Sequence, residues 1–522
     1  MHAPGCADLR GGAAMSRLVV ISNRVADPRR AAAGGLAVAM GDALRQTGGL
    51  WFGWSGAVTD DGAQAAPAGH VHRTQAGNVT LATVDLDRAD HDSYYAGYSN
   101  GVLWPVFHGR LDLASFDTGH AAGYRRVNQL LARRLLPLLA QDDILWVHDY
   151  HLIPLAAELR ALGCRQRIGF FLHIPLPPPT LLAAIPEHAW LMRCLFAYDL
   201  VGLQTRQDVQ HFERYVCDEA GGQSLGDGAL RAHGQRLVCR AFPIGIDVEG
   251  FAALALSGAS QDMHARMKHE YAQRRLLLGI DRLDYSKGLP QRLRAFRELL
   301  ARHPEQRRRA TLIQIGSPTR EGLDAYADIR RELESLCGAV NGDYGELDWM
   351  PVRYIHQTLP RDGIPGLCRA AAVGLVTPLR DGMNLVAKEY VAAQDPADPG
   401  VLVLSRFAGA AEQLQEALLV NPYDVHGTAA VVQQALQMPL QERRQRHQRL
   451  LQRIAEQDVH WWRKAFLSAL KEARPLERRE REAFGIPVPS IRQEQAPLRL
   501  ELAACPADGV ERDACRSVVS DR

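Results

Sequence analysis

Short hydrophobic runs alternate with amphipathic segments from Arg17 to Ala473. Runs rich in Val, Ile and Leu predict β-strands, and apolar residues that recur three and four positions apart predict helices. The strands predicted in the first half are Leu18–Ile21, Val79–Val84, Ile144–Val147, Ile168–Leu172, Leu200–Leu203 and Leu237–Phe242. Those predicted in the second half are Leu276–Gly279, Thr311–Ile315, Val352–Ile355, Val373–Val376, Val401–Leu404 and Ala417–Val420. Helices are predicted between them, including Tyr124–Leu139, Leu289–Arg302 and Asn384–Ala393.

Two such series predict an α/β protein with two domains. The second-half strands are nearly continuous in Val, Ile and Leu, as a sheet buried on both faces requires. Alternation with helices implies parallel βαβ units, so we expect two facing, Rossmann-like doubly wound domains with ligands in the cleft between them. The expected parts are a flexible leader (1–15), an N-terminal domain (16–245), a C-terminal domain (246–455), a helix that packs back on the N-terminal domain (456–474) and a disordered tail (475–522).

The two ends of the chain differ from the rest in pattern. Residues 440–473 are predicted to be helical throughout, with Trp462 and Phe466 on one apolar stripe. After Pro475 the sequence contains charges and prolines without a core pattern, which is typical of disorder. Residues 1–15 also lack periodicity, and both Met1 and Met15 can start translation.

Composition narrows the class of protein. Of 522 residues, 47% are hydrophobic and 23% charged, which excludes wholesale disorder. The formal net charge of +2 provides no global field for nucleic acid or an anionic membrane, so any anion site must be local. No uncharged apolar stretch reaches the ~20 residues of a membrane span, and there is no signal peptide, so we expect a soluble, cytoplasmic protein. Nine scattered cysteines without a C-x-x-C pair indicate reduced thiols and no zinc site.

Polar side chains follow several predicted strands of the first half. Arg24 follows the first strand, and Gly34-Gly35 precede a helix, where backbone N–H groups can approach a phosphate; a plain loop is the alternative. Asp149 lies between two histidines spaced as His-x-x-His, but no third metal ligand is near. Asp149 and His173 are therefore interpreted as groups presented to a polyol substrate, with a structural role as the alternative for the histidine.

Two segments of the second half indicate a binding site for a nucleotide-sugar. Arg282 and Lys287 follow a buried strand and precede a helix, where two cations and the helix dipole suit a diphosphate; a solvated basic loop is the alternative. Asp381 follows another buried strand, and Glu389 lies two helical turns further on. Two carboxylates in one strand–loop–helix unit suit the hydroxyls of a sugar and a ribose, although a capping role also explains Asp381. Neither G-x-G-x-x-G nor a P-loop motif is present.

These segments together resemble one enzyme family. The similar residues are Arg24, Gly34-Gly35, Tyr94-Tyr95, Trp104, WVHDYHLIP (146–154), GFFLHIPLP (169–177), DRLDYSKGLP (281–290) and TPLRDGMNLVAKEYVAAQDP (377–396). They resemble the α,α-trehalose-phosphate synthases, retaining glycosyltransferases of the GT-B type. The resemblance spans about residues 16–473. It implies glucose transfer from a nucleotide donor, typically UDP-glucose, to glucose 6-phosphate, with α,α-trehalose 6-phosphate and UDP as products.

The resemblance also implies a role for individual residues. The acceptor-binding residues would be Arg24, Tyr95, Asp149 and Arg320, the first and last holding the phosphate on the N-terminal domain. The residues that select the α anomer would be Trp104 and Ile174. The donor-binding residues would be Gly34, Gly35, Arg282, Lys287, Leu359, Leu385, Val386, Ala387, Lys388 and Glu389. The catalytic group would comprise Arg282 and Lys287, which stabilise the leaving phosphate, His173 and Asp381.

Several further expectations follow from the resemblance. No cofactor, metal, nucleic acid or membrane is implied, and a homodimer or homotetramer is expected. Leu359 stands where the family often has an aromatic residue beside the base, so UDP, ADP and GDP donors stay open. The alternatives are a non-catalytic regulatory subunit, which predicts a lost cation or carboxylate, and a phosphorylase, which predicts pyridoxal phosphate on a lysine. A nicotinamide dehydrogenase lacks support because the glycine fingerprint is absent.

Overall fold

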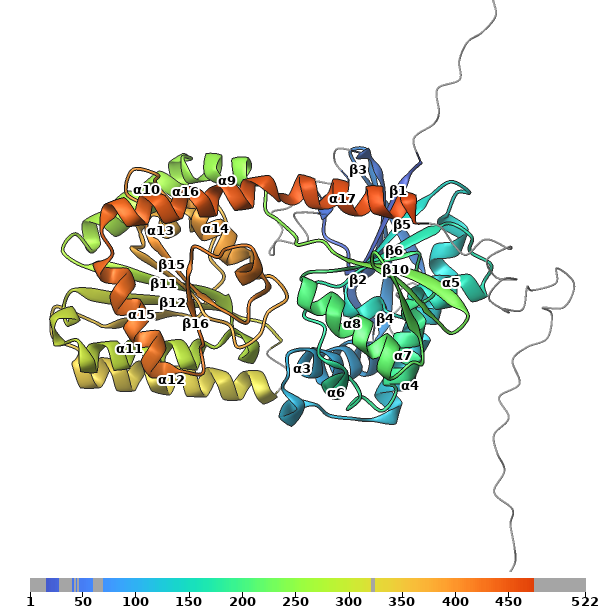
Figure 1. Ribbon diagram of the computed structural model, residues 1–522, viewed down its shortest axis with the longest axis horizontal. Helices are drawn as coiled ribbons and strands as arrows, with labels where there is room; N and C mark the ends of the chain where they lie inside the picture. The colour runs from blue at the N-terminus through green and yellow to red at the C-terminus, as the bar shows by residue number, and fades with distance from the viewer. Residues whose placement is uncertain are drawn as a thin grey trace, which may run out of the picture. The chain divides into compact units, whose positions relative to one another are not determined.

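The computed structural model describes residues 16–27, 40–41, 44, 47–59, 69–320 and 324–473. The predicted leader, the predicted tail, Gly34, Gly35 and both candidate start methionines lie outside these residues. The described residues form two α/β halves, each around its own sheet (Figure 1). We call residues 16–241 the N-terminal half and residues 248–456 the C-terminal half.

The N-terminal sheet has ten strands within the described residues, in the order β3-β4-β2-β1-β5-β6-β7-β10-β9-β8. The strands are β1 (Leu18–Arg24), β2 (Gly49–Thr59), β3 (Val71–Ala76), β4 (Val79–Asp87), β5 (Ile144–His148), β6 (Arg167–Phe171), β7 (Leu200–Leu203), β8 (Gln223–Gly226), β9 (Ala229–Ala232) and β10 (Gln235–Ala241). The run from β4 to β10 is parallel, and β3, β9 and β8 add antiparallel edges. All six strands predicted here are confirmed, and the others were not predicted.

Helices cover this sheet and connect its strands (Figure 1). The α-helices are α2 (Arg88–Asp90), α3 (Trp104–Phe107), α4 (Thr118–Leu135), α5 (Leu155–Ala161), α6 (Pro179–Leu182), α7 (His188–Leu195) and α8 (Arg206–Asp218). A π-helix, η1 (His91–Leu103), and the 3-10 helices η2 (Leu111–Leu113), η3 (Leu136–Leu138) and η4 (Tyr150–Leu152) complete the half. The predicted helix over Tyr124–Leu139 corresponds to α4 and η3.

The C-terminal sheet is parallel throughout, in the order β13-β12-β11-β14-β15-β16. The strands are β11 (Arg275–Arg282), β12 (Ala310–Ser317), β13 (Val352–Ile355), β14 (Val373–Val376), β15 (Val401–Ser405) and β16 (Leu418–Val420). Counted along the chain, this is the 3-2-1-4-5-6 order of a doubly wound fold, in which ligands bind where the order reverses. That reversal lies between β11 and β14. Every strand predicted for this half is confirmed, and β14 and β15 are buried along their whole length.

The remaining helices follow β10 along the chain, and all but the last of them lie in the C-terminal half. They are α9 (Val248–Ala255), α10 (Gly258–Glu270), η5 (Tyr285–Lys287), α11 (Leu289–Arg302), η6 (Pro304–Gln306), α12 (Asp324–Tyr344), α13 (Ile364–Ala370), α14 (Leu385–Ala393), η7 (Gly409–Glu412), α15 (Val425–Gln437), α16 (Leu440–Glu456) and α17 (Val459–Glu472). None of the helices in the described ranges is both long and apolar enough to cross a lipid bilayer.

The segment predicted to be helical over residues 440–473 is two helices. The break falls at Gln457 and Asp458, because the Asp458 side chain caps α17 by accepting a hydrogen bond from the Trp461 N–H at 2.7 Å. Helix α17 packs on β6 and β7 (Figure 1). Its Phe466 ring also stacks on Trp146 of the adjacent strand β5, with 4.8 Å between ring centres. The end of the chain's described part is thereby attached to the N-terminal sheet.

Candidate active site

Three strand ends of the N-terminal half bring predicted site residues to one edge of the sheet. Arg24 ends β1, Asp149 follows β5 and His173 follows β6. The strand register pairs Ser22 with His148, and His148 with Phe171, so these ends are adjacent. The backbone N–H of His173 donates to Asp149 Oδ1 at 3.2 Å. The edge therefore holds the carboxylate and imidazole that the sequence predicts.

Burial controls the charge of these groups. It raises the pKa of Asp149 to about 6, although hydrogen bonds and nearby arginines oppose the rise. It lowers the pKa of His173 to about 3 and that of His148 well below the ordinary value. The two rings are neutral near pH 7 and share a hydrogen bond of 3.1 Å between His148 Nδ1 and His173 Nε2. A neutral imidazole of such low basicity can hydrogen-bond a sugar hydroxyl but is a poor general base.

Arg24 and Tyr95 belong to one cluster of aromatic residues. The Arg24 guanidinium carbon lies 6.0 Å from the centre of the Trp54 ring. Trp54 is 5.4 Å from Tyr95, which stacks on His151 at 5.9 Å with 12° between the ring planes. Arg24 is exposed, so its guanidinium is available to an anion. Two predicted acceptor residues thus lie on neighbouring parts of the same surface.

The predicted diphosphate cations lie at the end of β11 and in η5. Arg282 is exposed, whereas Lys287 is mostly buried and its Nζ lies 2.5 Å from Asp381 Oδ2. Asn384 Nδ2 donates to the same oxygen at 3.0 Å. Gly288 turns the chain with φ of 66°, and a Cβ there would lie 2.4 Å from Thr377 O. The candidate donor cation and the candidate sugar carboxylate are therefore held together by a direct ion pair.

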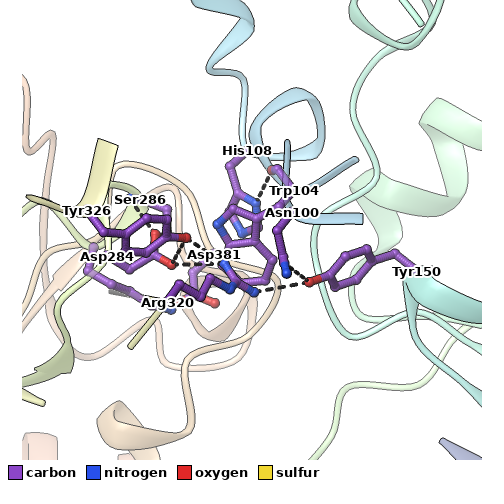
Figure 2. A network of polar contacts seen from close by, with 10 residues as sticks. Asn100, Trp104, His108, Tyr150, Asp284, Ser286, Arg320, Tyr326 and Asp381 are labelled. Atoms are coloured by element: carbon purple, nitrogen blue, oxygen red, sulfur yellow. Dashed lines mark hydrogen bonds and ion pairs between the residues drawn. The ribbon is translucent and has the colours of Figure 1, made fainter. Parts of the chain in front are cut away.

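Arg320 connects the two halves. Its guanidinium carbon lies 3.9 Å from the centre of the Trp104 ring, and its Nη2 donates to the Tyr150 hydroxyl at 3.1 Å (Figure 2). On the C-terminal side, Nη1 donates to Tyr326 at 2.6 Å and lies 3.4 Å from Asp284. The Arg282 guanidinium carbon is 5.6 Å from the same Trp104 ring. An acceptor candidate and a donor candidate thus meet at one aromatic side chain.

The groups around Arg320 were not all predicted. Burial would raise the pKa of Asp284, but Arg320, Arg282 and Lys287 together lower it below its ordinary value. His108 bonds to Trp104 O through Nδ1 at 2.7 Å, and burial lowers its pKa to about 4. Asp284 lies inside the DRLDYSKGLP motif (281–290), but only the fold shows that it pairs with Arg320, 36 positions away. His108 gave no sequence signal.

A buried arginine, also not predicted, supports the end of β11. Arg292 on α11 is 1% exposed and pairs with Asp281, the residue before Arg282, at 2.7 Å. It also donates to Thr377 Oγ1 and Gln314 Oε1, both at 3.0 Å. This network joins β11, β12 and the residue after β14, directly next to Arg282 in the chain.

The segment around α14 contains the other donor candidates. Leu385 and Val386 are half-buried at the start of the helix, Ala387 is buried, and burial raises the pKa of Glu389. The Lys388 side chain is fully buried and donates to Ile244 O and Gln413 Oε1, each at 2.6 Å. Its ammonium is thus occupied by protein oxygens, and burial lowers its pKa to about 7.

The last candidates lie beside this segment. Gly382 abuts the N-terminal half so closely that a Cβ would lie 2.1 Å from His173 O, next to the buried Ile174. Leu359 is half-buried against the core of its own half. A cavity of about 660 Å³ lies beside Asp381, with Pro175 and Thr205 of the N-terminal half in its wall. The described residues contain no group of three or more His, Cys, Asp or Glu side chains that could hold a metal ion.

Comparison with known proteins identifies the family. The model of glycosyltransferase family 20 matches residues 18–472. A trehalose-6-phosphate synthase of Sinorhizobium fredii is 49% identical over 460 residues, covering 87% of this chain and 98% of its own. One of an Enterobacter species is 48% identical over 463 residues, covering 88% and 96%.

Solved structures agree with the sequence comparison. An α,α-trehalose-phosphate synthase (UDP-forming) from Burkholderia xenovorans, in complex with glucose-6-phosphate, is 49% identical with a TM-score of 0.84 over 87% of this chain and all of that one. An E. coli structure bound with UDP-2-fluoro glucose is 46% identical with a TM-score of 0.83 over 88% and 100%. The two sheets are accordingly those of a GT-B fold, and the chain belongs to glycosyltransferase family 20.

Proposed function

We propose that the protein transfers glucose from UDP-glucose, or another nucleotide-glucose, to glucose 6-phosphate with retention of configuration. The products are α,α-trehalose 6-phosphate and the nucleoside diphosphate. The family and the relatives named trehalose-6-phosphate synthase support this reaction. The observation that carries the proposal is the meeting of Arg282 and Arg320 at the Trp104 ring, because a transfer between two anionic substrates needs a cation for each substrate near one point.

The donor lies against the C-terminal half in this proposal. Arg282 and Lys287 bind the diphosphate, Asp381 binds the glucose hydroxyls, and Glu389 binds the ribose. The start of α14 supports this because Leu385–Ala387 place their N–H groups in a helix's first turn, where an anion is favoured. Leu359 lies beside the base. Lys388 contributes through its backbone, since its ammonium is bonded to Ile244 and Gln413.

The acceptor lies against the N-terminal half. Arg24 and Arg320 hold its phosphate, and Tyr95 and Asp149 position the sugar. The chain of ring contacts through Trp54, Tyr95 and His151 supports this assignment, because it extends from Arg24 to the ring beside Tyr150, which bonds Arg320. Trp104 and Ile174 form the wall that favours the α anomer.

The mechanism follows from charge. The bond between the anomeric carbon and the β-phosphate oxygen breaks, and its electron pair goes to the leaving diphosphate. The acceptor's anomeric oxygen forms the new bond on the same face of the sugar, and its proton goes to the β-phosphate oxygen. Arg282 and Lys287 stabilise the departing charge, each hydrogen bond contributing about 1.5–3 kcal/mol. Asp381 is held by Lys287, which suits a binding group better than a nucleophile.

The domain boundaries are part of the same proposal. Residues 16–245 bind the acceptor and 246–455 the nucleotide-sugar, while 456–474 return to the N-terminal domain, which the packing of α17 on β6 supports. Cytoplasmic location stays a prediction from composition, and a homodimer or homotetramer stays a prediction of the family resemblance. Light scattering of the purified protein would measure the oligomeric state.

A donor panel tests the function. The protein is incubated with glucose 6-phosphate and UDP-, ADP-, GDP- or TDP-glucose, and nucleotide release is measured with and without acceptor. We expect acceptor-dependent release, with a disaccharide phosphate whose NMR spectrum shows two α-linked anomeric carbons. Absence of acceptor-dependent release with all four donors would contradict the proposal.

A further inference from the structure

Lys388 is bonded to a segment of chain that passes between the two halves. Strand β10 ends at Ala241 in the N-terminal sheet, and α9 begins at Val248 in the C-terminal half, so residues 242–247 form the first crossing. Lys388 Nζ donates to Ile244 O in this crossing at 2.6 Å. Its side chain is fully buried, and no carboxylate among the described residues pairs with it. Burying an ammonium among neutral oxygens is costly unless well-placed hydrogen bonds replace its lost hydration.

The second crossing is bonded to the same lysine through one intermediate. Residues 457–458 separate α16, which contacts α14, from α17, which packs on the N-terminal sheet. Lys388 Nζ donates to Gln413 Oε1 at 2.6 Å, and Gln413 Nε2 donates to Gln457 Oε1. The two crossings also touch directly, because the Val459 N–H donates to Ile246 O at 3.1 Å and a Cβ on Gly245 would lie 2.3 Å from Asp458 C.

We propose that Lys388 is a positioning residue that couples the donor-binding start of α14 to both crossings between the halves. The inference rests on the proposed function for the role of α14. Helix α14 has only nine residues, so a change at its first turn is transmitted to Lys388 within one turn. Through the hydrogen bonds of Lys388 to Ile244 and Gln413, a shift of that turn also shifts both crossings. The position of the donor relative to the acceptor then changes with it.

A matched pair of variants separates coupling from simple structural support. Lys388→Met keeps the length of the side chain and removes both hydrogen bonds. Gln394→Met is the control: Gln394 caps the other end of α14, is 5% exposed, and makes two hydrogen bonds, to Cys368 O at 2.7 Å and from the Gly400 N–H at 2.8 Å. Neither of its partners belongs to a crossing.

The kinetic prediction is specific to Lys388. We expect Lys388→Met to lower kcat at least tenfold. The Kd for glucose 6-phosphate, measured without a donor, should change by less than twofold. Gln394→Met should keep kcat within twofold of the wild-type value. If both variants lose thermal stability and keep kcat, Lys388 has only a structural role. If Lys388→Met raises the KM for UDP-glucose with kcat unchanged, Lys388 is a donor ligand. Either result overturns the proposal.

A milder variant tests the same connection if Lys388→Met fails to fold. Gln457 is half-buried in a short connection, so Gln457→Leu is expected to fold and to lower kcat about threefold or more. An unchanged kcat in this variant would contradict the proposal. Where both single variants fold, the double variant should be no worse than Lys388→Met, because residues of one network are non-additive. Additive losses would contradict a single coupling unit.

Amide hydrogen exchange of the ligand-free protein gives a readout that does not need turnover. Lys388→Met should increase exchange in residues 242–247 and 457–459 as well as in α14. Gln394→Met should increase it only near the end of α14 and around Gly400. Unchanged exchange at the crossings would overturn the inference even with an active enzyme. Conversely, inactive wild-type protein with this exchange pattern would refute the proposed function and retain the coupling.

Discussion

The guanidinium carbon of Arg320 lies 3.9 Å from the centre of the Trp104 ring, although the two residues belong to different halves of the chain. Arg320 is nearly buried there, with a side-chain exposure of 8%. A desolvated cation over an indole face is attracted by ~2 kcal/mol. The contact therefore orients an arginine of the C-terminal half toward the surface of the N-terminal half on which the acceptor is proposed to bind.

Trp104→Leu should raise the KM for glucose 6-phosphate about tenfold or more, because loss of the ring face frees Arg320 to move. The control is Trp190→Leu, since Trp190 holds the Arg125 guanidinium carbon at the same distance of 3.9 Å and packs edge-on against Tyr124, and neither partner is a candidate site residue. Steady-state kinetics and thermal unfolding of both variants make the comparison. A similar KM in the two variants would show that the Arg320–Trp104 contact does not support acceptor binding.

Arg282→Ala should lower kcat about a hundredfold, because the leaving diphosphate loses a charge-assisted hydrogen bond in the transition state. Arg275→Ala is the matched control, because Arg275 begins the strand that Arg282 ends and is likewise exposed. Arg24→Ala should instead raise mainly the KM for glucose 6-phosphate. Steady-state rates with both substrates varied distinguish these effects, and unchanged kinetics in Arg282→Ala and Arg24→Ala would remove both assignments.

Asp149→Asn should stabilise the ligand-free protein at pH 7.5 and have little effect near pH 4. The pKa of Asp149 rises from 3.8 to about 6 on folding, so the folded protein holds its proton more tightly, and stability falls as pH rises through this window. The difference reaches about 3 kcal/mol above pH 6, since one pKa unit corresponds to about 1.4 kcal/mol. Thermal unfolding at several pH values without substrate measures it, which avoids the titration of the substrate phosphate.

The backbone at Asp149 requires its own control. Its φ of 76° and ψ of 166° form a strained conformation for a residue with a Cβ, so a change of side chain alters the conformational energy as well as the charge. Asp227→Asn provides the comparison, because Asp227 has φ of 50° and a side chain that is 92% exposed. A pH-independent gain equal in both variants would contradict the titration of Asp149.

Glu412→Ala should weaken the contact between the halves. Its carboxylate accepts from the backbone N–H groups of Arg206 and Gln207 at 3.1 and 3.3 Å, capping α8 from the opposite half. We expect a stability loss of ~1 kcal/mol and a several-fold rise in the KM of both substrates. Asp424→Ala removes a cap within the C-terminal half, at α15, and should destabilise without changing KM. Equal KM values in the two variants would show that the Glu412 contact has no role in substrate binding.

The strand pattern and the strand-end motifs could be read from the sequence because both are local. Buried parallel strands such as Val373–Val376 are continuous apolar runs, and the residues after them must face the ligand edge of the sheet. Strand β8, at the outer edge of the N-terminal sheet, escaped prediction because it lacks such a run. All four of its residues are exposed. The break at Asp458 also escaped, because one capping side chain stops a helix without changing its apolar stripe.

What the sequence determined by itself is therefore the two-sheet α/β plan, the family and the segments that carry charge to the ligand edge, since each depends on neighbours a few residues apart. Only the tertiary structure decided the partners: Lys287 with Asp381, Arg320 with Trp104, and Lys388 with Ile244 rather than with the donor. Those pairs are separated by 94, 216 and 144 positions in the numbering. Hydrogen bonds and ring contacts act over a few ångströms of space, so the side chains that satisfy a buried charge are known only after the chain has folded.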